Sequence, residues 1–154
     1  MNKKIKNAQE SSYNGILFRS KSEMNIYKLF LENGFTLEYE PKKAVLMEEF
    51  NINFDFYDHK SDKNNKVLVN KRNKTILPIT YTPDFIYKGK NRVYIIEVKG
   101  FANDTFPLKK KLFLKLLNEK ENHNFAFVML YNLTNAKQLI KIIKQEENGN
   151  EQQP

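Results

Sequence analysis

Three ionisable side chains lie where two predicted strands would bring them together. Asp84 follows Thr-Pro at the start of one apolar strand, and Glu97 and Lys99 lie at the end of the next. Residues two apart on a strand project from the same face, so Glu97 and Lys99 point the same way. A hairpin between the two strands would lay Asp84 beside Glu97.

Two carboxylates and a lysine in one place are suited to metal-assisted hydrolysis of a phosphodiester. Neighbouring carboxylates repel each other unless a cation lies between them, and divalent ions such as Mg²⁺ prefer oxygen ligands. A nearby lysine would steady an attacking hydroxide or the charge on the phosphate. The alternative is that these charges only end strands and that Thr-Pro-Asp is a turn. Glu97, however, lies among apolar residues, where a carboxylate needs a reason.

The apolar periodicity predicts the elements that would position these side chains in a mixed α/β fold. Ser20 and Glu23 fit a capping box at the start of a helix that Gly34 ends, and this capping role alone would explain Glu23. Residues 88–91 predict a hairpin turn. The remaining expected elements are strands over 35–40, 44–58, 67–70, 75–77, 79–87, 92–99 and 125–131, a helix from Asp104 or Thr105 to about Glu119 with Pro107 in its first turn, and a helix capped by Thr134.

The chain reads as one domain with polar ends. We expect a flexible basic arm over residues 1–14, a single domain over 15–147 and a disordered tail over 148–154. The domain contains an insertion at about 42–79 with its own strands. One face of this insertion is predicted to carry the aromatic and aliphatic residues Phe50, Ile52, Phe54 and Phe56.

Composition narrows the function classes. The 154 residues include no cysteine, which excludes disulfides, thiol catalysis and thiolate metal sites. The formal charge of +8 favours polyanionic partners, nucleic acid before membrane. A bias toward Lys and Asn is an alternative explanation for part of this charge. No apolar run reaches a membrane span and no signal peptide is visible, so we expect no membrane partner and a cytoplasmic location, that of the host cell if a phage encodes the protein.

Several motifs resemble the PD-(D/E)XK nuclease superfamily. Pro83-Asp84, then twelve residues, then Glu97-Val98-Lys99 is similar to its signature. More narrowly, the chain resembles the endonuclease I type of phage Holliday-junction resolvases and a related phage family of unknown function. The likeness spans about residues 16–131 and is carried, in order, by Phe18-Arg-Ser-Lys-Ser-Glu23, Glu38-Tyr-Glu40 before a proline, Tyr81-Thr-Pro-Asp-Phe85 and Glu97-Val-Lys-Gly100.

This resemblance implies a restriction-endonuclease-like core, a central mixed β-sheet flanked by helices in the order αβββαβ, with the insertion as an extra β element. It implies that Mg²⁺ or Mn²⁺ is bound by Asp84, Glu97 and the Val98 carbonyl, and that Lys99 activates or orients the nucleophilic water. Glu23 would complete the acidic cluster directly or through water, and Glu38 would be a further acidic position.

The resemblance also implies a DNA substrate, branched DNA or a Holliday junction in phage recombination or replication. Hydrolysis in line with the leaving 3′ oxygen would leave 5′-phosphate ends. Arg19 would contact a phosphate, although a surface arginine explains it nearly as well. A basic cluster after the site would make sequence-independent phosphate contacts or would form only a solvated helix face; it comprises Lys109, Lys110, Lys111 and Lys115.

Other functions stay open at this point. The resolvase is an intertwined dimer, and the insertion at 42–79 falls in the region that would bridge two protomers, so a homodimer and junction specificity are both undecided. A restriction- or transposon-like nuclease that cuts duplex DNA is one alternative. A non-catalytic nucleic-acid-binding module on the same fold is another, and an accessory phage protein with a basic assembly surface is a third.

Overall fold

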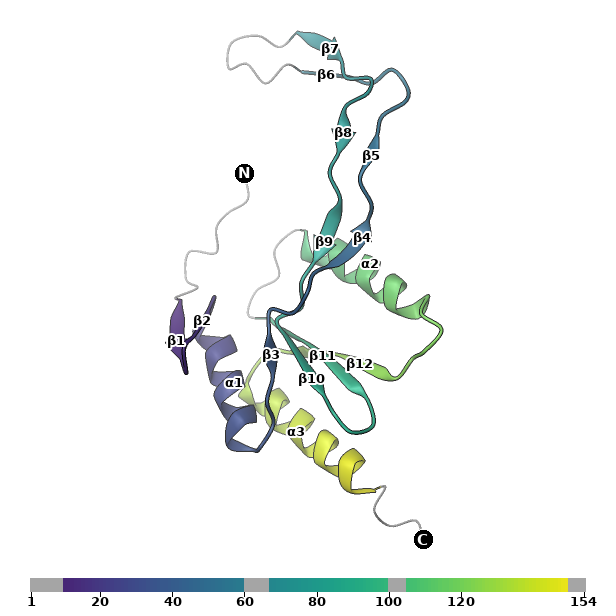
Figure 1. Cartoon of the computed structure of the whole chain (residues 1–154). Coiled ribbons are helices and arrows are strands. Elements are labelled where there is room, and N and C mark those ends of the chain that lie inside the picture. The colour runs from purple at the N-terminus through teal and green to yellow at the C-terminus, as the bar shows by residue number, and fades with distance from the viewer. Residues whose placement is uncertain (1–9, 60–66, 100–104, 150–154) are drawn as a thin grey trace.

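A four-stranded mixed sheet forms the centre of the molecule (Figure 1). The computed structural model describes residues 10–59, 67–99 and 105–149. The sheet has the strand order β12-β11-β10-β3, in which β11 and β12 are parallel and the other pairs are antiparallel. Its strands are β3 (Glu38–Tyr39), β10 (Phe85–Lys88), β11 (Val93–Val98) and β12 (Phe125–Leu130). The expected mixed α/β class is therefore confirmed.

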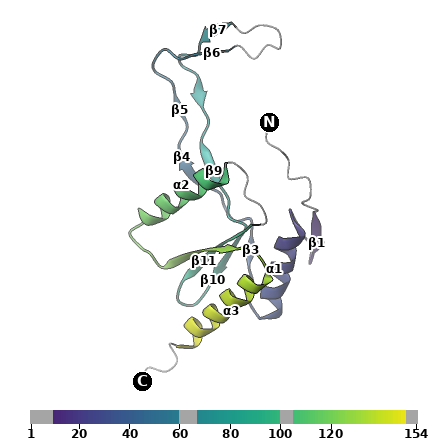
Figure 2. The ribbon, with the colours of Figure 1, turned by 180° about the vertical axis from the view of Figure 1, so that it is seen from behind.

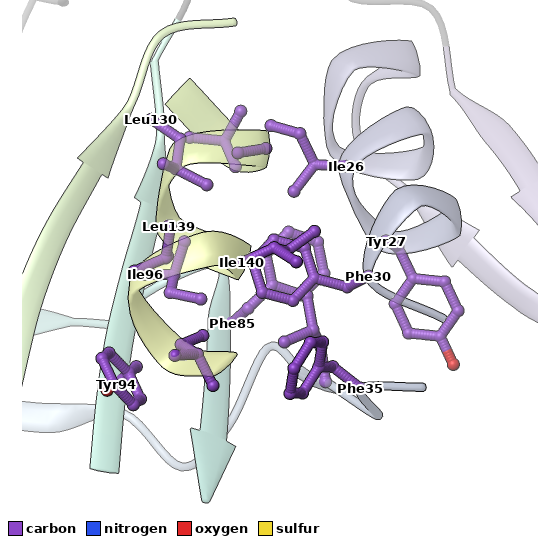
Figure 3. Close-up of a cluster of buried hydrophobic side chains, with 14 of the residues drawn as sticks. Ile26, Tyr27, Phe30, Phe35, Phe85, Tyr94, Ile96, Leu130, Leu139 and Ile140 are labelled. Atoms are coloured by element: carbon purple, nitrogen blue, oxygen red, sulfur yellow. The ribbon is translucent and has the colours of Figure 1, made fainter. Parts of the chain in front are cut away.

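Helices cover both faces of this sheet. Helices α1 (Lys21–Glu32) and α3 (Leu133–Asn148) pack against each other on one face, and α2 (Phe106–Asn118) lies on the other (Figures 1 and 2). Figure 3 shows the larger core, where Phe30 of α1 and Ile140 of α3 meet the sheet residues Phe85 and Ile96. The smaller core joins α2 to the opposite face through Tyr81, Ile95, Phe106, Phe113 and Leu117.

The start of α1 is fixed by local hydrogen bonds. Ser20 is the N-cap residue, and its hydroxyl oxygen accepts a hydrogen bond from the Glu23 N–H at 3.2 Å, as the sequence predicts. A hairpin of β1 (Ser11–Tyr13) and β2 (Ile16–Phe18) precedes the helix and packs against it. The expected flexible arm over residues 1–14 is therefore wrong from Ser11 onward, and residues 1–9 lie outside the described residues.

A long two-stranded ribbon projects from the sheet (Figures 1 and 2). We call residues 44–59 and 67–81 the ribbon. In the described part of the chain, its six strands pair only with one another. From base to tip the pairs are β4 (Ala44–Met47) with β9 (Ile79–Tyr81), β5 (Phe50–Asn51) with β8 (Thr75–Ile76), and β6 (Tyr57–His59) with β7 (Leu68–Asn70). This confirms that the insertion carries strands of its own.

The four apolar residues expected on one face of the insertion differ in burial. Ile52 is buried, but Phe50, Phe54 and Phe56 are exposed, because a two-stranded ribbon has no second layer to cover an apolar face. The strand expected over 79–87 is also divided into β9 and β10. Pro83 lies in the break and lacks the N–H that a continuous ladder needs.

The C-terminal elements follow the expected order with two corrections. Asn132, not Thr134, caps α3, because its side-chain oxygen accepts from the Asn135 N–H at 2.9 Å. Strand β12 is an edge strand, and only Leu130 in it is buried. Helix α3 extends through Asn148, so the expected tail is wrong at residue 148, and residues 150–154 lie outside the described residues.

Helix α2 starts where it is expected, with a proline in its first turn. Thr105 occupies the N-cap position without a side-chain capping bond, and Asp104 lies outside the described residues. In the stretches that the structure describes, no helix has both the length and the apolar character needed to cross a membrane.

Candidate functional site

The sheet register brings the predicted carboxylates together. Phe85 of β10 lies opposite Ile96 of β11, so the preceding residue, Asp84, falls beside Glu97. Asp84 accepts a hydrogen bond from the Val98 N–H at 2.7 Å, which fixes it against the end of β11. Asp84 is 6% exposed and Glu97 is 3% exposed, which is rare for carboxylates.

A negative charge on Asp84 is unfavourable in the free protein. Its Oδ1 contacts Arg19 Nη2 at 3.3 Å, and its Oδ2 is held by Val98. Burial and the charge of Glu97 raise the pKa of Asp84 to about 7, although the Val98 N–H and the Lys99 ammonium favour its ionised form. A carboxylate raised in this way by burial and a like charge is a candidate for a functional site.

Glu97 is held on both of its oxygens. Lys99 Nζ lies 2.6 Å from Oε1, and the Tyr81 hydroxyl donates to Oε2 at 2.5 Å. Burial and the bond to Glu97 raise the pKa of Tyr81. Lys99 Nζ also lies 4.0 Å from the centre of the Phe106 ring, so α2 helps to place this lysine. Glu97 and Lys99 therefore share one face of β11, as the spacing predicts.

Glu23 has a capping role and a second role as a link. Its Oε1 accepts from the Ser20 hydroxyl at 2.8 Å, and its Oε2 accepts from the Tyr39 hydroxyl at 2.8 Å. The Tyr39 oxygen in turn accepts from the Arg19 N–H at 3.0 Å. Burial, with the bond to Glu23, raises the pKa of Tyr39 to about 12. Glu23 is thus connected toward Asp84 through Tyr39 and Arg19.

The structure separates Glu38 from this cluster and brings Glu40 near it. Glu38 lies opposite Ile86 and pairs with Lys88 at 3.2 Å. Glu40 donates its N–H to the Asp84 carbonyl at 2.9 Å, and its Oε1 lies 2.5 Å from Arg19 Nε. Among the described residues, the contacts of Glu38 do not include Asp84 or Glu97, and a role for Glu38 in the acidic site stays a prediction.

Sequence reasoning missed three side chains of this network: Tyr39, Glu40 and Tyr81. All three lie inside the motifs that carry the resemblance, which was the available signal. Their partners depend on the strand register, and the spacing within each motif does not reveal it. Glu40, for example, faces Arg19 only because the chain turns at Glu40 with a positive φ of 45°.

The donor set fits a hard divalent cation with few protein ligands. Among the described residues, no group of three or more His, Cys, Asp or Glu side chains could hold a metal ion together. Mg²⁺ typically takes one or two carboxylates and completes its shell with water and substrate phosphate. Asp84 and Glu97 provide those two carboxylates, and their mutual repulsion is what a cation would relieve. Val98 enters the observed arrangement through its N–H.

The predicted DNA-binding lysines all lie on α2. Lys109 and Lys110 are half-buried, whereas Lys111 and Lys115 are exposed. Lys115 pairs with Glu119 at 3.0 Å, one helical turn along. Helix α2 packs beside the base of the ribbon, and its first residue touches Lys99. The helix therefore presents its basic residues next to the site without placing them in it.

Comparison with known proteins identifies a family but no closer relative. A family model described as "Protein of unknown function (DUF1064)" matches residues 3–131. The match includes all the carboxylates of the site, Lys99 and the whole ribbon, and it ends before α3. No curated protein and no solved structure matches the chain significantly. The chain belongs to the DUF1064 family.

Proposed function

We propose that this protein is a Mg²⁺- or Mn²⁺-dependent endodeoxyribonuclease with a restriction-endonuclease-like core. The observation that carries the proposal is the pair of buried, adjacent carboxylates Asp84 and Glu97, with Lys99 Nζ 2.6 Å from Glu97 Oε1. The order α1-β3-β10-β11-α2-β12 around the central sheet is compatible with the αβββαβ core of that superfamily.

The side chains have separate roles in this reaction. Asp84 and Glu97 would hold the cation, which supplies positive charge to the phosphodiester and acidifies water when bound. Lys99 would orient the attacking water, because Glu97 and Phe106 fix its ammonium beside the site. Water would form the new bond to phosphorus as the bond to the 3′ oxygen breaks, leaving a 3′-hydroxyl and a 5′-phosphate. Tyr81 would keep Glu97 in place without touching substrate.

The charge distribution supports a DNA partner for the core. Segment 44–81 carries six Lys or Arg against five Asp or Glu, so seven of the eight formal charges lie elsewhere. The lysines of α2, next to the site, would make salt-sensitive contacts to phosphates. We propose branched DNA as the substrate, met in the cytoplasm of the cell or of a phage host.

A homodimer formed through the ribbon is part of the same proposal. Among the described residues, eight of the fourteen exposed large hydrophobic side chains lie in the ribbon, and its near-neutral charge does not repel a second copy. Within the described residues, each ribbon strand pairs with one neighbour, which leaves its other edge available to a second copy. Light scattering behind size exclusion should find a dimer for the wild type and a monomer for the double variant Phe50→Ser, Phe54→Ser.

The function is tested by cleavage of a labelled four-way junction and its matched linear duplex. Wild type and Asp84→Asn would each be assayed with Mg²⁺, with Mn²⁺ and with EDTA. We expect cutting of the junction that requires metal and is lost in the variant. Equal cutting of the duplex would keep the chemistry but would favour the restriction- or transposon-like alternative.

A non-catalytic DNA-binding module is favoured by one specific observation. Each oxygen of Asp84 and Glu97 already has a protein partner: Arg19, Val98, Lys99 or Tyr81. Binding of either DNA that persists in EDTA, without cutting under any condition, would support this module. If the protein neither binds nor cuts any DNA form, both proposals fail and an accessory assembly protein takes their place.

A further inference from the structure

Arg19 occupies an unusual position between two acids of different burial. Its Nε lies 2.5 Å from Glu40 Oε1, and its Nη2 lies 3.3 Å from Asp84 Oδ1. The Asp84 side chain is 8% exposed, whereas Arg19 and Glu40 are 59% and 40% exposed. The guanidinium thus reaches from the surface to one oxygen of a carboxylate that a metal would need.

The two contacts of Arg19 are unequal. The bond to Glu40 is short and charge-assisted, whereas the contact with Asp84 is long for a hydrogen bond. A divalent cation at Asp84 would repel the nearby guanidinium and compete for the same oxygen. Arg19 would then lose its weaker contact and keep the stronger one, with both Nη groups turned outward.

We propose that Arg19 is the resident counter-ion of Asp84, that metal binding displaces it, and that Glu40 then holds it at the mouth of the site for a substrate phosphate. Arg19 is a contact residue in this scheme, and Glu40 is a positioning residue that acts through Arg19. The inference rests on the proposed metal-dependent function of Asp84 and Glu97.

The backbone at Glu40 supports a dedicated role for this residue. Its φ of 45° lies in the left-handed region, which is unfavourable for a residue with a side chain. The same residue closes the ladder next to Asp84, because its N–H donates to the Asp84 carbonyl. Strain of this kind persists where the surrounding structure fixes it, often at functional sites. Here it places the Glu40 carboxylate against Arg19.

A single substitution of Arg19 should change metal affinity and DNA cleavage in opposite directions. If Arg19 competes with the metal, Arg19→Gln should bind Mn²⁺ more tightly than wild type. If Arg19 also contacts the phosphate, the same variant should cleave DNA more slowly. A residue that only supports the fold would lower metal affinity and cleavage together.

The experiment is titration calorimetry of Mn²⁺ binding to the intact protein without DNA. We compare wild type, Arg19→Gln, Asp84→Asn and the matched control Arg72→Gln. Arg72 is equally exposed and also faces an aspartate, Asp55 at 3.5 Å, but it lies in the ribbon. We expect the Mn²⁺ affinity of Arg19→Gln to rise about fivefold while that of Arg72→Gln stays at the wild-type value. Unchanged or weaker Mn²⁺ binding by Arg19→Gln would overturn the inference alone.

Two further comparisons separate the possible failures. If wild type and Arg19→Gln both bind Mn²⁺ no better than Asp84→Asn, the metal-dependent function fails and the inference with it. Glu40→Gln should bind Mn²⁺ more weakly than wild type, because Arg19 would then pair with Asp84 alone. The double variant Arg19→Gln, Glu40→Gln should have the same Mn²⁺ affinity as Arg19→Gln if Glu40 acts only through Arg19. A double variant much weaker than Arg19→Gln would instead make Glu40 a metal ligand and overturn its positioning role.

Discussion

The central sheet and the ribbon contain similar apolar residues, but these residues are buried in the sheet and largely exposed in the ribbon. In the sheet, Phe85 is fully buried between α1, α3 and the neighbouring strands. In the ribbon, Phe54 is 60% exposed, and in the part of the chain that the structure describes the nearby strands pair only with one another. The difference shows that apolar content alone does not define a core. What matters is whether a second layer is present to exclude water.

The polar groups repeat the same contrast. In the ribbon, the ion pair of Arg72 with Asp55 lies between two exposed side chains and contributes little to stability. Beside the inner strands β10 and β11, Asp84 and Glu97 are buried, and each is held by a positively charged side chain. The sheet therefore buries two carboxylates, Asp84 and Glu97, at the proposed site, whereas Arg72 and Asp55 of the ribbon remain exposed to solvent.

The largest expected effect is the loss of DNA cleavage when Lys99, the residue that follows β11, is replaced. Lys99→Met should lower the rate of metal-dependent cleavage about 10²–10⁴-fold, because it removes the group that orients the water. Lys71→Met, which alters a ribbon lysine, should leave the rate near that of wild type. Single-turnover rates on the preferred DNA measure both. Equal losses in the two variants would mean that the ribbon belongs to the reacting site.

The next effect is on stability and compares one residue type in two places. Phe85→Ala should lower the free energy of unfolding by about 3–5 kcal/mol, because it leaves a cavity in the core. Phe54→Ala should change it by less than about 0.5 kcal/mol. Urea unfolding of the protein at a concentration that keeps it monomeric gives both values. A large loss for Phe54→Ala would show that the ribbon is covered even in the monomer.

The stability of the protein should depend on pH through Asp84, which lies beside the inner strands of the sheet. The pKa of Asp84 is raised by folding from 3.8 to about 7, so the folded state binds more protons between these values and loses stability as pH rises through them. The loss attributable to Asp84 should reach up to about 4 kcal/mol above pH 7. Asp84→Asn cannot ionise, so in EDTA its melting temperature should exceed that of wild type at pH 8 and not at pH 4. Saturating Mg²⁺ should remove the difference, whereas a constant gap at every pH would contradict this reading.

The smallest effect should come from the residue where ribbon and sheet meet. Tyr81 ends β9, and its hydroxyl donates to Glu97. Tyr81→Phe should lower the free energy of unfolding by about 1–2 kcal/mol, because one oxygen of a buried carboxylate loses its donor. The affinity for Mn²⁺ should fall less than in Asp84→Asn, and calorimetry can rank the two. Identical affinities in Tyr81→Phe and wild type would show that Glu97 needs no such support.

Local signals predicted the parts of the fold that depend on neighbours in the chain. The cap at Ser20 and the hairpin between β10 and β11 follow from short-range chemistry, and both are present, although the turn spans residues 89–92 because Lys88 still pairs with Val93. The observed register places Asp84 beside Glu97, whereas a turn over 88–91 would place it opposite Ile95, so the hairpin predicted that the two lie near each other but not their register. These features needed no knowledge of the sheet order.

The features that were missed depend on distant parts of the chain. Whether Glu38 or Glu40 approaches Asp84 is decided by the pairing of β3 with β10, two segments about 45 residues apart. The exposure of Phe50 and Phe54 follows from the lack of a covering layer, which alternation along a strand cannot reveal. Likewise, β12 is strongly apolar, yet it lies at the edge of the sheet.

The ribbon leaves the core and returns to it through adjacent residues. Glu40 precedes its first strand, Asp84 follows its last, and the two are joined by a backbone hydrogen bond of 2.9 Å. The two ends of the insertion are therefore held together where they join the core. The length of the ribbon beyond β4 and β9 does not affect the geometry of the sheet. Residue pairs can be added to the ribbon or removed from it beyond β4 and β9 at little cost in loop-closure entropy. We expect members of the family to vary in length here, and a small foreign domain grafted at the tip should leave the sheet able to fold.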